Sequence, residues 1–334
     1  MGYTTTMMKR PTSTTVSARV AGVRRRCPAG RAHRAAGVRA GLVVALAALA
    51  VLALLPAAAL AGVDDWQHTW EVVGLANALQ GQPKPPDGVM VYYLGDSIAR
   101  ESTVSDQPWT RQLRIRAATA GKARAFGYTV AGHNQTFGMD EMIVQRLPAT
   151  APGQPRGLLL IGVGISRFIG PPTPQQPFSV DPPPAGELPE LSPWRQHLYD
   201  GRAPLSSARK RELVQRWMDR RWAGFRRNEA ANLAAIERLI KTARAKGLQP
   251  VILDLPLNTK AVGTGLDKPR RAIRAGCSDL ARRYGIEYVH FTQAIGLPSS
   301  AYWDLHHLLA PGYTRWQSRL SAELVKLLPA RATP

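Results

Sequence analysis

Residues 89–102 read VMVYYLGDSIARES, and this stretch predicts the fold of the chain. Residues 89–94 form a short run of β-branched, aromatic and other apolar side chains, which is typical of a buried strand. Gly95 then predicts a tight turn where the backbone passes close to a ligand, and a helix-compatible stretch begins at about Ile98. A serine at such a turn is lifted toward solvent with backbone N–H groups beside it. Ser97 is therefore a candidate acyl-transfer nucleophile, and the alternative is that it only caps the helix.

Strand and helix patterns alternate along the rest of the chain. Apolar runs predict further strands at 123–130, 157–163, 249–255 and 286–291, and helical periodicity predicts helices at 98–120, 139–147, 206–246, 267–284 and 310–328. The helix at 206–246 is expected either to be continuous or to break near Gly224, and the Pro-rich stretch 170–205 is expected to form a long insertion loop. Apolar strands alternating with helices predict an α/β fold with a parallel sheet covered on both faces. Its ligand site should lie beyond the carboxyl ends of the strands.

A second motif lies near the C-terminus, in the sequence YWDLHHLLAPGY just before the last predicted helix. It contains Asp304 and His307 in an Asp-x-x-His pattern. A serine hydroxyl is a weak nucleophile until a base takes its proton, and the base needs an acid to orient it and stabilise its charged form. Ser97, His307 and Asp304 supply these three groups.

The Gly-Asp-Ser after the first strand, the Asp-x-x-His before the last helix and the parallel sheet between them resemble the SGNH (GDSL-type) hydrolases. The resemblance covers about residues 89–328. It implies a three-layer flavodoxin-like sheet, with Ser97 as the nucleophile and with Asp304 and His307 as acid and base. It implies no metal or organic cofactor.

The resemblance also implies an oxyanion hole, made by a backbone N–H after the second strand and an asparagine side chain after the third. Gly138 in NQTFGMDEM fits the first position best, with Gly132 as the rival. The asparagine is missing from residues 162–168, GVGISRF, where Ser166 stands at the aligned position. Losing one donor costs about 3–4 kcal/mol of transition-state stabilisation. Ser166 is expected to donate instead, or Asn134 to reach in from the second block; otherwise the site is weak or inactive.

Other residues fall near the predicted site. His306 is expected to lie at the pocket rim. Arg100 and Arg167 would contact an anionic substrate, or else lie on the surface. Asp254, at the end of its strand, is expected to be a cap or loop anchor. Core packing is expected for most of Trp194, Trp217, Trp222 and Trp303, and a sugar-stacking surface is the alternative.

The N-terminal part of the chain predicts a membrane segment. Residues 1–40 carry nine Lys and Arg and no Asp or Glu, and are expected to be a disordered cytoplasmic leader. Residues 41–62 are uncharged and match the roughly 20 residues needed to cross a bilayer. The charge asymmetry places everything after them outside the membrane. The alternative is a signal peptide cleaved near Ala61, which would release a secreted protein. Residues 63–87 predict a helix and a linker leading to a domain at 88–330.

The formal charge of +21 is concentrated in two places. Nine positive charges lie in the leader, which leaves 35 Lys and Arg against 23 Asp and Glu. Residues 202–246 hold 13 of these basic residues and four acidic ones. Outside a membrane the matching counter-charges are anionic envelope polymers or lipid head groups, with a solvated helix face as the alternative. A nucleic-acid partner is therefore not expected.

Cysteine usage adds two expectations. Cys27 precedes the predicted membrane segment and Cys277 follows it, so a disulfide between them is not expected. No Cys or His spacing typical of a metal site is present in the sequence.

Two functions compete. The first is a membrane-anchored extracytoplasmic serine esterase or O-acyltransferase, acting on an acyl ester of a cell-envelope polysaccharide. The second is a catalytically weak or inactive protein of the same fold, which binds an anionic envelope polymer or a partner protein through residues 202–246.

Overall fold

The computed structural model describes residues 88–173 and 197–331. All of them belong to the compact unit Leu60–Pro334. The predicted leader, membrane segment and linker, and most of the Pro-rich insertion, lie outside the described residues. Within the part that is described, no helix is long and apolar enough to cross a membrane.

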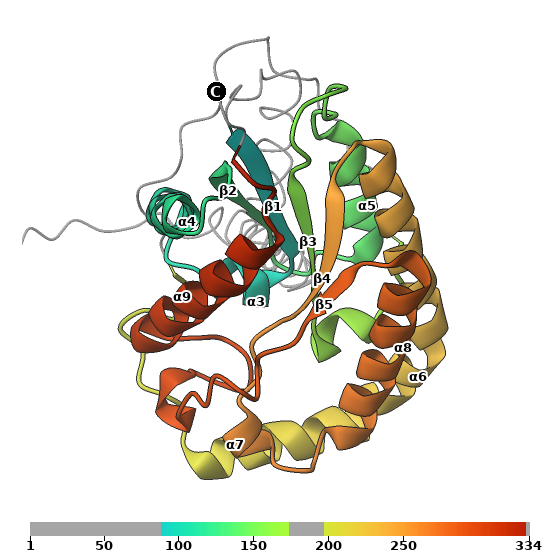
Figure 1. Cartoon of the computed structure of the whole chain (residues 1–334). Coiled ribbons are helices and arrows are strands. Elements are labelled where there is room, and N and C mark those ends of the chain that lie inside the picture. Colours follow the sequence, from blue (N-terminus) through green and yellow to red (C-terminus); the bar gives the residue numbers. More distant parts are fainter. Residues whose placement is uncertain (1–87, 174–196, 332–334) are drawn as a thin grey trace, which may run out of the picture. The chain divides into compact units, whose positions relative to one another are not determined.

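Five strands form one parallel sheet in the order β2-β1-β3-β4-β5 (Figure 1). They are β1 (Gly88–Gly95), β2 (Arg124–Ala131), β3 (Leu158–Val163), β4 (Gln249–Asp254) and β5 (Glu287–Val289). This is the flavodoxin-like strand order, in which a ligand site lies outside the carboxyl ends of the strands. The predicted α/β fold with a flavodoxin-like parallel sheet is confirmed.

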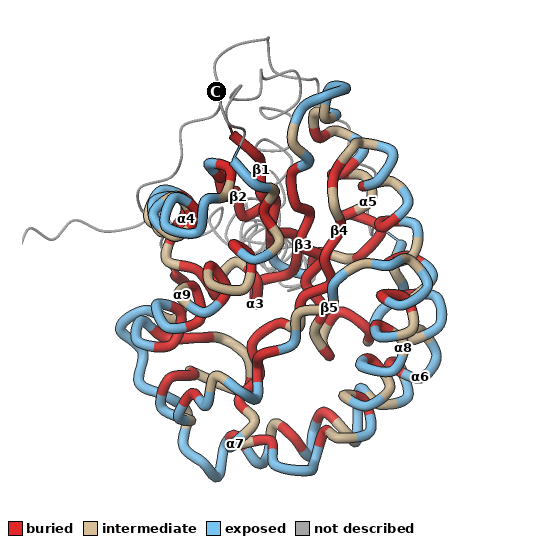
Figure 2. The backbone as a smooth tube through the Cα atoms, viewed as in Figure 1, coloured by how far each residue is buried: buried red, intermediate tan, exposed pale blue. Residues whose placement is uncertain are grey.

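The interior strand β1 is buried along its whole length because helices cover both faces of the sheet (Figure 2). Successive side chains of a strand point to opposite faces. Tyr92 and Leu94 accordingly join one hydrophobic cluster, and Val91 and Tyr93 join the other. A strand that is buried on both sides reads as a continuous apolar run, which explains the pattern that predicted it.

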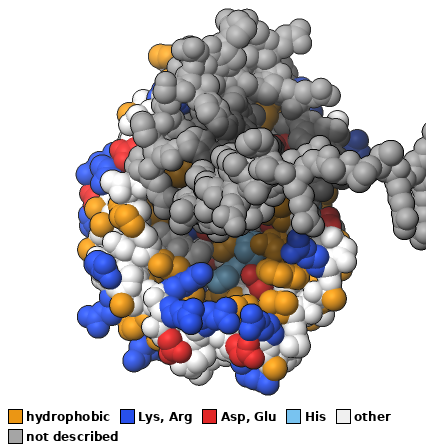
Figure 3. All heavy atoms as spheres, turned by 180° about the vertical axis from the view of Figure 1, so that it is seen from behind, with side chains coloured by type: hydrophobic (Ala, Val, Ile, Leu, Met, Phe, Trp, Pro, Cys, Tyr) orange, Lys and Arg blue, Asp and Glu red, His pale blue; other side chains and the backbone are white. Residues whose placement is uncertain are grey.

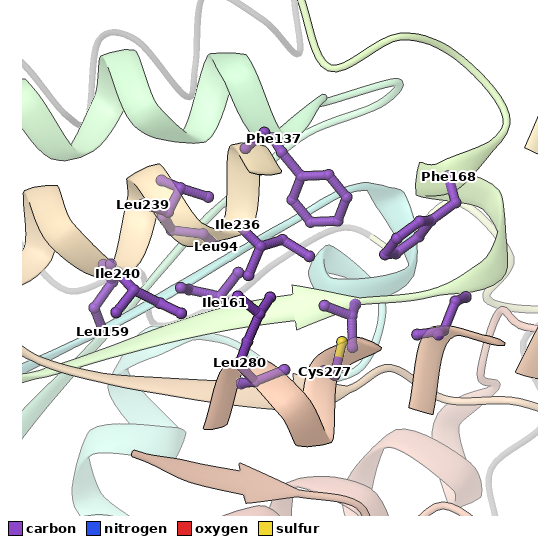
Figure 4. Packing of buried hydrophobic residues seen from close by; sticks show 14 of the residues in the cluster. Leu94, Phe137, Leu159, Ile161, Phe168, Ile236, Leu239, Ile240, Cys277 and Leu280 are labelled. Carbon is purple, nitrogen blue, oxygen red and sulfur yellow. The ribbon is translucent and has the colours of Figure 1, made fainter. Parts of the chain in front are cut away.

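The helices divide between the two faces. One layer contains α5 (Phe137–Arg146), α6 (Ser207–Ala245) and α8 (Asp267–Tyr284), and the other contains α4 (Asp106–Thr119) and α9 (Ala310–Leu327) (Figure 1). Figure 4 shows the packing beneath the first layer, where Leu239 and Ile240 of α6 meet Ile161 of β3, and Cys277 lies near Leu280. Cys277 is a free, buried cysteine. Short helices α7 (Thr259–Val262), η1 (Ile165–Phe168) and η2 (Ser299–Ala301) complete the described elements.

The helix predicted at 98–120 is divided, which corrects the prediction. A single turn, α3 (Ser97–Arg100), is followed by a loop and then by α4. The Ser102 hydroxyl donates to Ala99 O at 2.8 Å, and Val104 N donates to the side chain of Gln317 at 2.8 Å. Serine side chains that bond to nearby backbone favour turns over helix interiors. The loop is therefore stabilised by side chains that the helical pattern does not reveal.

Of the two alternatives at Gly224, the continuous helix is found, because α6 runs through this residue without interruption. A Cβ at Gly224 would lie 3.0 Å from Ile169 O. The side-chain amide of Asn228 donates to this same carbonyl at 2.6 Å and to Gly224 O at 3.0 Å. The glycine thus permits close packing against the segment that follows η1, and does not end the helix.

Candidate active site

The carboxyl end of β1 positions the candidate nucleophile. Ser97 is the first residue of α3, and Asp96 caps this helix by accepting a hydrogen bond from Ile98 N at 3.0 Å. A Cβ at Gly95 would lie 2.4 Å from the Cβ of Ala99. The glycine therefore permits close packing of α3 on the strand, and the approach of a ligand at this turn stays a prediction.

Three side chains meet at this end of the sheet. The Ser97 hydroxyl lies 3.1 Å from Nε2 of His307, across 210 residues of sequence. On the other side of the ring, Nδ1 of His307 lies 3.0 Å from Oδ2 of Asp304. The second oxygen of Asp304 accepts the backbone N–H groups of His306 and His307, both at 2.8 Å. The serine, imidazole and carboxylate thus form one continuous chain of hydrogen bonds.

The loop that carries Asp304 and His307 is closed on itself. Trp303 N donates to His307 O at 2.9 Å, and Tyr302 forms an isolated antiparallel bridge with Leu308. The acid and the base therefore belong to one tight loop ahead of α9. Their relative geometry is local, and only the contact with the serine depends on the tertiary fold.

Two buried residues hold this loop from outside. The ammonium of Lys210 in α6 donates to Ser299 O at 2.8 Å and to Tyr302 O at 3.0 Å. The side-chain amide of Asn258 donates to Asp304 O at 3.3 Å. Burial lowers the pKa of Lys210. Buried polar groups of this kind specify one conformation because each lost partner leaves an unsatisfied group.

The charges and hydrogen bonds of His307 and Asp304 suit a general base at His307. Burial by itself lowers the pKa of His307, but the hydrogen bond and negative charge of Asp304 outweigh it and raise that pKa above its usual value. Burial also acts to raise the pKa of Asp304, and the hydrogen bond from His307 and its charge hold this pKa below the usual range. Asp304 is therefore ionised at neutral pH and stabilises a proton on the imidazole.

The candidate oxyanion donors are placed differently from the expectation. Gly138 lies in the first turn of α5, and its N–H donates to Pro172 O at 2.7 Å. Gly132 instead follows β2 directly, and its N–H lies 3.3 Å from Gly95 O, close to the candidate nucleophile. The geometry therefore favours Gly132 over Gly138. The N–H of Ser97 is the first of α3 and has no acceptor among the described residues.

Ser166 and Asn134 were the two candidates to replace the missing asparagine. Neither donates a hydrogen bond toward Ser97 in the described part of the chain. The Ser166 hydroxyl donates to Oδ2 of Asp96 at 2.8 Å, so it holds the cap of α3 in place. Asn134 is exposed, with a φ of 53° that suits an asparagine in a left-handed turn. It has no hydrogen bond to Ser97 in the described part of the chain.

Neither arginine near the strand ends lies free on the surface. Arg167 is buried, with its guanidinium 2.6 Å from the Asp140 carboxylate and 4.0 Å from the centre of the Phe137 ring. Arg167 therefore forms a buried structural ion pair with Asp140. This corrects both predictions for Arg167, a contact with an anionic substrate and a position on the surface. Arg100 pairs with the buried carboxylate of Glu101.

His306 and Asp254 lie beside the site and not in it. His306 lines a cavity of about 50 Å³ at the carboxyl ends of β3 and β4. Asp254 lines the same cavity, accepts a hydrogen bond from the Tyr288 hydroxyl and lies 3.9 Å from Arg274. Burial raises the pKa of Asp254. No cluster of three or more potential metal ligands occurs in the described ranges.

No pattern in the sequence predicts the residues that cover the histidine. The ring of Tyr199 lies 4.5 Å from the His307 ring and stacks on Trp303 at 4.4 Å. Its segment is anchored by Leu198 N, which donates to Glu101 at 3.0 Å, and by His197, 2.7 Å from Thr103 O. These residues lie within the Pro-rich stretch 170–205, which has no clear periodicity, so only the tertiary structure identifies them.

Comparison with known proteins gives structural likenesses only. No protein-family model matches the chain, and no curated protein matches it. A lipase/acylhydrolase from Enterococcus faecalis is 10% identical with a TM-score of 0.39, covering 73% of this chain and 100% of that one. A GDSL-like lipase from Bacteroides thetaiotaomicron is 13% identical with a TM-score of 0.40, covering 78% and 98%. A lipolytic G-D-S-L family protein from Veillonella parvula is 15% identical with a TM-score of 0.41, covering 72% and 100%.

Proposed function

We propose that this chain is a serine-dependent ester hydrolase or acyltransferase of the SGNH type. One observation carries the proposal, namely the hydrogen-bonded chain from the Ser97 hydroxyl through His307 to Asp304 at the carboxyl end of β1. The three groups come from opposite ends of the domain, and a hydroxyl, an imidazole and a carboxylate in this order form an acyl-transfer site.

The geometry supports the following reaction. The oxygen of Ser97 attacks the carbonyl carbon of the ester as Nε2 of His307 takes the hydroxyl proton. The tetrahedral intermediate then expels the alcohol, which receives that proton from His307, and leaves an acyl group on Ser97. Water or an acceptor hydroxyl attacks the acyl-enzyme with His307 again as base, which restores the serine. Asp304 orients the imidazole and stabilises its charged form throughout.

The oxyanion in this reaction is held by backbone groups. The N–H of Ser97 is available, and Gly132 lies near the serine with only a long hydrogen bond of 3.3 Å to break. A side-chain donor is missing, since Ser166 is committed to Asp96. Because one donor is worth about 3–4 kcal/mol, we expect modest turnover that is best on activated esters.

The cellular setting is part of the proposal. The uncharged run at 41–62 and the basic leader before it support a single-pass anchor, or a signal peptide, with the domain outside the membrane. An enzyme in that position meets acyl esters of cell-envelope polysaccharides. No cofactor takes part in the reaction as written.

The second function, a binding protein with a weak or inactive site, is favoured by one observation. Neither of the expected donors at Gly138 and Ser166 has a free hydrogen. In that case the fold serves binding alone, and Ser97 does not react with an ester.

Turnover of p-nitrophenyl acetate by the full chain distinguishes the two functions. We expect measurable hydrolysis that is lost in Ser97→Ala and kept in Ser207→Ala, which changes an exposed serine on the first turn of α6. Equal hydrolysis by the wild type and Ser97→Ala would contradict the nucleophile assignment. Hydrolysis absent from all three proteins would support the binding function.

A further inference from the structure

Four arginines form a straight row along the first part of α6, here called the arginine stripe: Arg209, Arg216, Arg220 and Arg227. Their spacing is seven, four and seven residues. At 3.6 residues per turn this places all four within about 20° of one line, over a length of about 27 Å. All four are exposed.

The arginine stripe has few acidic partners. Arg209 pairs with Glu212 at 2.6 Å, and the other three have no ion pair within the described part of the chain. The same is true of three more exposed arginines on this part of α6: Arg211, Arg221 and Arg226. Like charges four residues apart destabilise a helix, by about 0.2–0.5 kcal/mol per pair. The pattern therefore does not serve the stability of the helix.

The second half of α6 differs, because exposed basic residues in it form ion pairs with acidic side chains. There Arg238 lies 3.0 Å from the Glu141 carboxylate, and Lys241 lies 2.9 Å from Glu237. One helix thus has a balanced half and an unbalanced half. Figure 3 shows one face of the molecule, on which Lys and Arg side chains gather in a band. The difference indicates that the unbalanced half meets an external anion.

The start of the arginine stripe adjoins the proposed active site. Leu205 N, two residues before α6, donates to Trp303 O at 2.8 Å. The guanidinium of Arg202 lies 5.5 Å from the ring centre of Tyr199, which in turn contacts His307. Arg202 therefore lies beside the ring that covers His307, seven residues before the first arginine of the stripe.

The chemistry of the surface selects among anions. A helix that lies on a bilayer inserts an apolar face, but the exposed large hydrophobic residues of the described chain are Ile115 and Leu198, and neither is on α6. Guanidinium groups bind a carboxylate through paired hydrogen bonds, as they also bind a phosphate, so the choice between these anions depends on the substrate of Ser97. A substrate for Ser97 must also carry acyl esters, and the repeated hydroxyl groups of a polysaccharide can carry them.

We propose that the arginine stripe binds a linear polysaccharide bearing carboxylate groups, and that it holds this chain while an acyl ester reaches Ser97. The inference rests on the proposed function for its last step, the presentation of the ester. The binding step does not depend on catalysis. It is therefore measured in full-length Ser97→Ala, which lacks the nucleophile.

Binding of polygalacturonate to full-length Ser97→Ala is the test, with neutral dextran of equal length as the control ligand. We expect binding of polygalacturonate that weakens with salt, and none of dextran. Adding the triple change Arg216→Gln, Arg220→Gln and Arg227→Gln should weaken binding about tenfold, because three exposed charge contacts, each of them weak, are lost together.

A matched triple variant removes the same charge elsewhere, through Arg271→Gln, Arg282→Gln and Arg319→Gln on α8 and α9. These side chains are exposed and lie beside acidic partners, and we expect this variant to bind polygalacturonate like its parent. Equal losses in the two triple variants would overturn the proposal, because they would report net charge alone. Tighter binding to anionic phosphatidylglycerol vesicles or to an oligonucleotide than to polygalacturonate would also overturn it. Loss of p-nitrophenyl acetate turnover, by contrast, tests the proposed function alone.

Discussion

The ring of Tyr199 covers the imidazole of His307, with ring centroids 4.5 Å apart and an angle of 39° between the rings. The imidazole is therefore positioned by two different contacts, the hydrogen bond to Asp304 at 3.0 Å and the face of an aromatic ring. Tyr199 also stacks on Trp303, which belongs to the same tight loop as the histidine. The segment before α6 is thus part of the site.

Truncating Tyr199 should weaken catalysis by releasing the histidine. We expect Tyr199→Phe to retain kcat/KM, because the ring contact remains. We expect Tyr199→Ala to lower it about tenfold, since an aromatic pair is worth about 0.5–1.5 kcal/mol. The acid limb of the pH profile should move in the alanine variant only. Equal activities in the two variants would show that the ring does not position His307.

The pH profile should report the raised pKa of His307. The neutral imidazole is the active form of the base, and Asp304 raises the pKa of His307 despite burial. The acid limb of kcat/KM should therefore have its midpoint above the ordinary value of about 6.5. In Asp304→Asn the limb should shift to lower pH, and kcat should fall by about 10⁴-fold, as in a comparable triad. A wild-type midpoint below 6.5 would contradict the electrostatic account.

Lys210 should be required for the loop that carries the acid and the base. It is 2% exposed, and its ammonium donates to Ser299 O and Tyr302 O. In Lys210→Met these buried carbonyls lose their donor, which costs about 1–3 kcal/mol for each unsatisfied group. We expect a lower free energy of unfolding in urea together with reduced turnover. Lys241→Met, at an exposed pair on the same helix, serves as the control and should leave both unchanged.

The close packing beneath Ser97 predicts a non-additive pair. In Gly95→Ala the new methyl would lie 2.4 Å from the Cβ of Ala99, and overpacking of this kind costs about 1–3 kcal/mol. Ala99→Gly alone should cost about 1 kcal/mol through helix propensity. The double variant should be more stable than the sum of the single effects.

Gly170→Ala is the control for the packing pair, because no atom outside its chain neighbours lies within 4 Å of its added Cβ. It should leave the free energy of unfolding nearly unchanged. Strict additivity of Gly95→Ala and Ala99→Gly would mean that the two positions are not in the tight contact described above.

Local patterns in the sequence were sufficient where local forces decide the structure. The helix predicted at 267–284 is found as α8, and it ends at Gly285 in a left-handed C-cap. Asp304 and His307 were identified because an acid and a base three residues apart lie in one loop. Ser97 could be identified because fourteen consecutive residues, 89–102, contain the whole pattern of a strand, a turn and the start of a helix.

Long-range contacts decided the features that the sequence did not reveal. The break between α3 and α4 depends in part on Gln317, more than 200 residues away. Gly138 and Gly132 both follow the second strand, and only the tertiary contact with Pro172 separates them. Tyr199 reaches His307 from a stretch with no periodic pattern. Each of these requires knowing which segments fold together.

Activation of the Ser97 hydroxyl by His307 can be tested by covalent labelling of the serine. The full chain is treated with a fluorophosphonate probe, and the modified residue is located by mass spectrometry of the digested protein. We expect a single adduct on Ser97 that is strongly reduced in His307→Ala and absent in Ser97→Ala. An unlabelled Ser97 in the wild type, or labelling that is as fast without His307, would contradict this activation.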